Sequence, residues 1–146
     1  MHLIEAFGLA ILLSVGCVLI HYEVLAFVSR PPRDGRYRRT HVIVCILGML
    51  VGHLIEAALF AFGYWFAIAV LHLNGISAPG PLSRLQYMYF SIETFTTQGV
   101  GDVYAVGPLR MVASIEPLIG LVLVGWSTAF TFQIARRMPA NDGLQS

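Results

Sequence analysis

Charged residues are few in this sequence, and lysine is missing from it altogether. Charged residues make up 12% of the 146 residues and hydrophobic residues 57%, so that the mean hydropathy reaches +0.74. This balance excludes a soluble domain with a polar surface and is typical of a protein embedded in lipid. The net charge of +1 gives no indication of a nucleic-acid partner.

Cysteine is also scarce. Cys17 and Cys45 both lie inside apolar stretches, so the sequence indicates buried thiols rather than a disulfide framework. A cleaved signal peptide is not expected either, because His21 and Tyr22 stand where small residues would mark a cleavage site. No hydrolytic or redox motif is recognisable, and we therefore do not expect an enzyme or a bound cofactor.

Three apolar segments are long enough to cross a bilayer, at about residues 3–28, 41–73 and 109–135. Each exceeds the roughly 20 residues that a hydrocarbon core of about 30 Å requires. The predicted fold class is therefore an all-α membrane protein with three transmembrane helices per subunit.

Most of the nine arginines fall in two groups, one in the link at 30–40 and one after the third span. These are Arg30, Arg33, Arg36, Arg38 and Arg39, and then Arg136 and Arg137. By the positive-inside rule both groups are cytoplasmic. We therefore expect a cell membrane (plasma or inner), an external N-terminus, an external loop at 74–108 and a short cytoplasmic tail at 138–146.

The external loop contains the most informative pattern. Ser83 is a suitable N-cap for a helix over 84–96, which at about 1.5 Å per residue reaches roughly 18 Å and cannot cross the membrane. The next residues, 97–102, alternate glycine with other residues, and such a backbone survives inside a membrane only where it is buried or lines a wet pathway. A half-helix that leads into this segment between two spans predicts a cation-selective pore.

The run from Ser91 to Tyr104 resembles the pore domain of the tetrameric potassium-channel superfamily. Its sequence, S-I-E-T-F-T-T-Q-G-V-G-D-V-Y, is similar to the S-V-E-T-A-T-T-V-G-Y-G-D-L-Y of simple bacterial members. The resemblance covers about residues 41–135 and implies an outer helix at 41–73, a pore helix at 84–96, a filter at 97–102 and an inner helix at 108–135. Residues 1–29 then form an extra N-terminal transmembrane helix ahead of a pore domain at 41–137.

The resemblance also implies a homotetramer whose filter carbonyls replace the hydration shell of K⁺. Carried over by position, the filter residues are Thr97, Gln98, Gly99, Val100 and Gly101, with K⁺ at the first four. The partners expected are other copies of the chain and membrane lipid.

Three positions depart from the family pattern. Gln98 stands in place of an aliphatic residue, Val100 in place of tyrosine and Ala105 in place of proline. Strict K⁺ selectivity and weak selectivity among monovalent cations are therefore both open. A third alternative is a non-conducting accessory subunit.

Several polar residues are candidates for supporting the filter. Glu93 and Asp102 match a pair that shares a proton in similar channels, since two close carboxyl groups do not both ionise cheaply; the alternative is that Glu93 only bonds backbone amides. Thr96 adjoins the filter. Glu116 lies at filter depth, where an ionisable group is expected to be functional, with Gln98 or the pore-helix backbone as its partner. The alternative is a protonated glutamic acid that only satisfies a bond freed by Pro117.

Three further residues are candidates for gating. His53 and Glu56 share one helix face, and His21 on the first span is the expected partner of Glu56; the cluster is either a proton-sensitive gate or a structural hydrogen bond between helices. Gly120 is either a hinge of the inner helix or a site of close helix packing.

The first span lacks the spaced arginines of a voltage sensor and could brace the outer helix or bind another subunit or regulator. Trp126 faces either lipid or the pore cavity.

A rival hypothesis from another functional class is a haem-binding electron carrier. Haem ligation needs histidines at the same depth on facing helices, and only His21 and His53 come near this. That hypothesis leaves the run from Thr96 to Asp102 unexplained.

Overall fold

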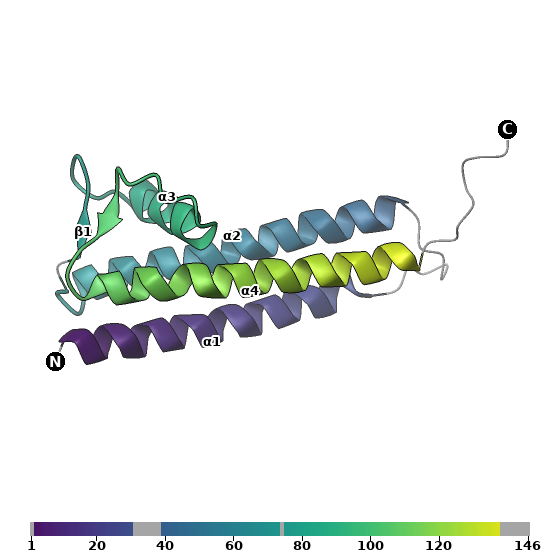
Figure 1. Cartoon of the computed structure of the whole chain (residues 1–146), viewed down its shortest axis with the longest axis horizontal. Coiled ribbons are helices and arrows are strands. Elements are labelled where there is room, and N and C mark those ends of the chain that lie inside the picture. Colours follow the sequence, from purple (N-terminus) through teal and green to yellow (C-terminus); the bar gives the residue numbers. More distant parts are fainter. Residues whose placement is uncertain (1, 31–38, 74, 138–146) are drawn as a thin grey trace, which may run out of the picture.

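Three long helices lie side by side along the length of the molecule (Figure 1). They are α1 (His2–Val28), α2 (Arg39–Ala69) and α4 (Leu109–Arg136) in a computed structural model that describes residues 2–30, 39–73 and 75–137. All three are long and apolar enough to cross a membrane. The all-α membrane fold with three spans is therefore confirmed.

The order of the helices places the described arginines that flank the link and end the third span at one end of the bundle and the pore loop at the other. Helices α1 and α4 run in the same direction and α2 runs against them (Figure 1). The end of α1, the start of α2 and the end of α4 therefore share one end, which carries Arg30, Arg39 and Arg136. Arg33, Arg36, Arg38 and the tail at 138–146 lie outside the described residues.

The predicted half-helix is α3 (Arg84–Phe95), which begins with a complete capping box. The Gln86 amide donates to the Ser83 hydroxyl at 3.3 Å, and the Ser83 amide donates to the Gln86 side chain at 2.7 Å. Two helix-start donors are thereby satisfied by neighbouring side chains. The helix stops after Phe95, with Thr96 as its C-cap.

Helix α2 is shorter at its outer end than the hydropathy predicted, since it ends at Ala69 and not near residue 73. His72 takes a positive φ of 54°, and the Leu73 amide donates to the Ala67 carbonyl at 2.9 Å. This turn reverses the chain and buries Leu73. Hydropathy alone does not register such a turn, because Val70, Leu71 and Leu73 around His72 are apolar.

A small strand pair, which we did not predict, joins the two arms of the pore loop. Strand β1 (Ile76–Ser77) pairs antiparallel with β2 (Tyr104–Ala105), with Ile76 opposite Ala105. The Val106 amide extends the pairing by donating to the Gly75 carbonyl at 2.7 Å. The pairing holds the beginning and the end of the loop together above α3.

Helix α1 packs against both α2 and α4. Its buried face includes Ala6, Ala10 and Cys17, and a Cβ placed at Gly63 of α2 would lie 2.4 Å from a Leu13 methyl group. Small residues thus let α1 and α2 approach closely, as is common between helices in membranes. The first span therefore packs on the outer helix, and its role, as a brace or as a site for another subunit or regulator, stays a prediction.

Candidate functional site

Residues 97–102, which the sequence predicts to be the filter and which are called the filter segment here, begin where α3 ends, and the helix end holds the first of them. The Thr97 amide donates to the Thr94 carbonyl at 3.0 Å, and the Gln98 amide donates to the Glu93 carbonyl at 2.8 Å. These bonds satisfy two carbonyls in the last turn of the helix, those of Glu93 and Thr94. The segment leaves α3 at the level of the middle of α4 (Figure 1).

The backbone of the filter segment alternates between two conformations. Thr97, Gly99 and Gly101 have positive φ angles of 61°, 59° and 85°, whereas Gln98 and Val100 do not. This alternation is the geometry that turns successive carbonyl oxygens to the same side. Among the described residues, no amide or hydroxyl group donates to the carbonyls of 97–101. These oxygens are therefore available to a ligand, and K⁺ binding by them stays a prediction.

Thr97 is notable because it is a β-branched residue in the left-handed region. Such a residue at positive φ is an outlier that costs of the order of 1–3 kcal/mol. It keeps this conformation only where the surrounding structure holds it there. Among the described non-glycine residues, only His72 also has a positive φ angle. The strain lies at the inner end of the filter, where the resemblance assigns a role to the threonine hydroxyl.

Glu93 and Asp102 lie close enough for the charge of one to act on the other. Burial raises the pKa of the Glu93 carboxyl, and the negative charge of Asp102 raises this pKa further. The Tyr89 hydroxyl donates to Asp102 Oδ1 at 3.2 Å, and the Val103 amide donates to the same oxygen at 2.9 Å. The proximity agrees with a proton shared between the two carboxyl groups, which stays a prediction.

Glu116 is fully buried, but its partners are not those expected. The Tyr64 hydroxyl of α2 donates to Oε2, and the Ser91 hydroxyl of α3 contacts Oε1, both at 2.5 Å. The predictions of Gln98, the pore-helix backbone or a bond freed by Pro117 were wrong, because Glu116 points between α2 and α3, and both its oxygens are taken by hydroxyl groups. Gln98 is exposed.

The contacts of Ser91 indicate the protonation state of Glu116. The Ser91 hydroxyl lies 2.7 Å from the Ala57 carbonyl oxygen as well as 2.5 Å from Glu116 Oε1. A hydroxyl group has one proton, and the carbonyl has none to give. If the Ser91 proton goes to Ala57, the short contact with Glu116 requires a proton on the acid. The arrangement therefore fits a neutral glutamic acid that joins three helices.

Gly120 allows the end of α3 to touch the middle of α4. A Cβ at this position would lie 2.1 Å from the Phe95 carbonyl oxygen. The packing role considered for this glycine is therefore confirmed, whereas its role as a hinge stays a prediction.

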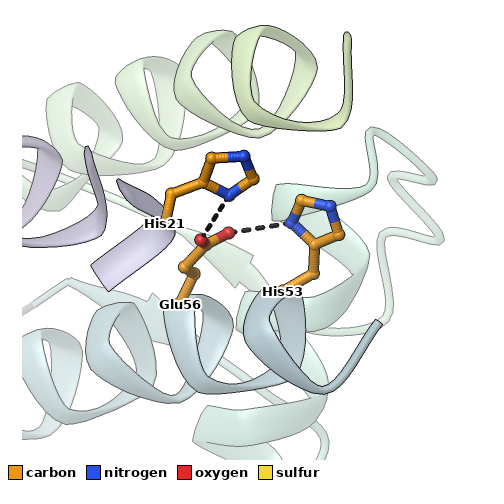
Figure 2. Close-up of side chains that lie close together, drawn as sticks. All are labelled: His21, His53 and Glu56. Atoms are coloured by element: carbon orange, nitrogen blue, oxygen red, sulfur yellow. Dashed lines mark hydrogen bonds and ion pairs between the residues drawn. The ribbon is translucent and has the colours of Figure 1, made fainter. Parts of the chain in front are cut away.

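A second polar cluster joins α1 to α2 (Figure 2). His21 Nδ1 lies 2.9 Å from Glu56 Oε1, and His53 Nδ1 lies 2.8 Å from Glu56 Oε2. The expectation that His21 is the partner of Glu56 is confirmed. His53 Nε2 also lies 3.1 Å from the Ser127 hydroxyl of α4.

Trp126 was left undecided by the sequence. Its ring packs at 5.3 Å from the His21 ring, so it contacts the extra helix.

Sequence reasoning missed Tyr64, Ser91 and Ser127, each of which binds a predicted residue. The signal was present, because each is a hydroxyl-bearing residue within an apolar helix. Which of the several such residues faces an acid or a histidine depends on helix rotation, and that is not visible from spacing within one helix.

Comparisons with known proteins extend these observations. A family model described as an ion channel matches residues 40–137, which include α2, the pore loop and α4. No curated protein and no solved structure matches the chain. Helix α1 lies outside the matched range.

Proposed function

The chain belongs to the ion-channel family, within the pore-domain superfamily that the filter run resembles, and we propose that it conducts K⁺ as a homotetramer. The observation that carries this proposal is the alternation of positive φ at Thr97, Gly99 and Gly101. Four copies of such a segment around one axis supply rings of carbonyl oxygens that replace the hydration shell of a permeating cation. The K⁺-binding carbonyls belong to Thr97, Gln98, Gly99 and Val100.

The exposure of the filter supports a symmetric assembly. All residues from Thr97 to Asp102 are exposed in the single chain, and the Val100 side chain is 61% exposed. A groove of about 540 Å³ separates the filter from α4 and is lined by residues that include Thr97, Gly99 and Pro117. One chain has too few spans to enclose a pore, and closed symmetry is the usual solution.

The position of α3 supports selection of a cation. The C-terminal end of this helix directs its partial negative charge toward the level of Gly120, below the filter. A cation that leaves the filter on this side meets a favourable field without a fixed anionic side chain.

The orientation proposed from the arginines agrees with this assignment. The pore loop lies at the end of the bundle opposite Arg30, Arg39 and Arg136 (Figure 1). If the arginine end is cytoplasmic, as the positive-inside rule requires, the filter opens to the outside of the cell membrane, where the N-terminus also lies. The C-terminus is then cytoplasmic.

The departures at Gln98 and Val100 support a second candidate, a channel that passes K⁺ and Na⁺ with little preference. Valine cannot provide the hydroxyl group that tyrosine would offer to the surroundings of the filter. The Tyr89 hydroxyl, bonded to Asp102 at 3.2 Å, provides one tie between α3 and the outer end of the filter. This tie favours K⁺ selectivity over the second candidate.

The reversal potential of the purified protein in a planar bilayer tests the proposal. Under opposed K⁺ and Na⁺ gradients, with both ions present on both sides, we expect reversal near the K⁺ equilibrium potential. Clear openings that reverse near zero would identify the weakly selective channel. A verified tetramer that stays silent across pH and voltage would indicate the accessory subunit.

A further inference from the structure

The cluster of His21, His53 and Glu56 has the composition and spacing of a metal-binding site. One ligand atom from each of the three side chains lies within 4.8 Å of the other two. Both imidazole rings turn Nδ1 toward the carboxylate (Figure 2). We propose that these three side chains bind one divalent transition-metal ion, Zn²⁺ in the first place, and that the ion clamps α1 to α2.

The distances require little movement to admit an ion. The two Nδ1 atoms lie 2.9 and 2.8 Å from the Glu56 oxygens. In a tetrahedral zinc site with bonds of about 2.0 Å, neighbouring ligand atoms are about 3.3 Å apart. Small side-chain rotations therefore open the cluster enough. Two histidines and one carboxylate leave a fourth position for water, a donor set that suits zinc and related metals.

The charge of the cluster favours a bound cation. Glu56 is fully buried, and an ionised carboxylate in such a place is costly unless a positive charge accompanies it. The sequence has no lysine, and within the described residues the ion-pair partners of Glu56 are His21 and His53. Neutral imidazoles donate hydrogen bonds without adding charge. A divalent ion would supply the missing positive charge and bind both rings at once.

The surroundings support one of the two histidines, His53, in the way that metal sites usually require, whereas His21 Nε2 is buried without a hydrogen-bond partner among the described residues. A metal-bound histidine is commonly held in place by a partner on its other ring nitrogen. His53 has this partner in the Ser127 hydroxyl at 3.1 Å from Nε2, and the His21 ring is held against Trp126. The His53 side chain is 15% exposed, which leaves a route by which the ion can enter.

The ion would connect α1, which the family model does not match, to α2, which it does. His21 belongs to α1, outside the matched range, whereas His53 and Glu56 belong to α2 within it. His53 also contacts Phe95, at the end of α3, with ring centroids 6.0 Å apart. A metal ion at this position would therefore stiffen the packing directly beneath the filter.

The experiment is a metal titration of the purified full-length chain in detergent after treatment with a chelator. Co²⁺ is followed by its visible absorption, and Zn²⁺ by equilibrium dialysis with elemental analysis. We expect one ion per chain. His21→Ala, His53→Ala and Glu56→Gln should each weaken binding at least tenfold, because each removes one of three protein ligands. His2→Ala, which removes an exposed histidine paired with Glu5, should leave binding unchanged.

A second measurement keeps the test decisive if a variant folds poorly. Zn²⁺ should raise the unfolding temperature of the unaltered protein, because a ligand that binds only the folded state stabilises it. The conservative variant His21→Asn, checked for helical content, should lose this response. Absence of bound metal, or equal binding by a His21→Ala/His53→Ala double variant, would overturn the proposal. A stability that changes with pH but not with Zn²⁺ would also overturn the proposal, because the cluster would then bind a proton and not a metal ion. None of these readouts needs ion conduction, so they stand apart from the channel proposal.

Discussion

The Gly120 Cα faces the Phe95 carbonyl so closely that a Cβ there would lie 2.1 Å from the oxygen. This contact joins the middle of α4 to the last residue of α3, directly before the filter. Because the neighbouring atom belongs to the backbone, it cannot rotate away as a side chain would. The position of the filter relative to the inner helix therefore depends on the absence of one methyl group.

The first prediction concerns this contact. Gly120→Ala should separate α4 from α3 and lower the free energy of unfolding by about 1–3 kcal/mol, the usual cost of overpacking. Gly125→Ala is the matched control, since nothing lies within 4 Å of its added Cβ and alanine favours a helix. Thermal unfolding in detergent and bilayer currents measure both effects. Equal behaviour of the two variants would show that α4 shifts without cost.

The second prediction concerns the protonation of Glu116. Glu116→Gln should preserve stability and current, because an amide can accept from Tyr64 and donate to Ser91 as the neutral acid does. Glu116→Ala should cost several kcal/mol, since it leaves a cavity and removes the acceptor of the buried Tyr64 hydroxyl, while Ser91 keeps the Ala57 carbonyl as its partner.

Denaturation of both variants provides the measurement for Glu116, with retention of the oligomer followed by size-exclusion chromatography. A glutamine variant as unstable as the alanine variant would mean that the acid is ionised in the folded protein.

The third prediction concerns pH and the pair behind the filter. The pKa of Glu93 is raised, first by burial and then by Asp102. The folded protein therefore keeps this proton at pH values where the unfolded chain has lost it. The resulting stability is complete below the ordinary glutamate pKa and is lost as the pH rises through the folded pKa.

Asp102→Asn should lower the pKa of Glu93 in the folded protein toward its ordinary value, because it removes the neighbouring negative charge while burial still raises the pKa. The range of pH over which this stability is lost should then be narrower. Carbon NMR of labelled glutamate, or unfolding temperature against pH, measures the change. Glu5→Gln is the control, since Glu5 pairs with exposed His2 far along the sequence from the filter. An unaltered titration of Glu93 in the Asp102→Asn variant would contradict an interaction between the two groups.

The fourth prediction concerns the filter backbone. Gly101→Ala should abolish or strongly reduce current, because alanine at a φ of 85° costs roughly 1–2 kcal/mol in each subunit and favours a carbonyl turned away from its neighbours. Gly80→Ala, in the same loop with open space around its Cβ, should conduct normally. Single-channel recording separates the two. Normal K⁺ conduction by Gly101→Ala would argue against a role of this dihedral.

Much of the architecture follows from signals that lie close together in the sequence. Each span is recognisable from about 20 successive apolar residues, the start of α3 from Ser83 and Gln86, and the filter from its alternating glycines. These features depend on neighbours within a few turns, so hydropathy, capping and backbone freedom are sufficient to predict them.

The partners of the buried polar residues depend on tertiary structure alone. Glu116 meets Tyr64 and Ser91, which are 52 and 25 residues away, because α2, α3 and α4 rotate these faces toward one another. The strand pair above α3 is equally non-local, as it joins Ile76 to Ala105. The sequence by itself determined three spans, a half-helix and a filter segment. Only packing decided which polar groups meet, since helix rotation and depth are set by close contact between side chains of different helices.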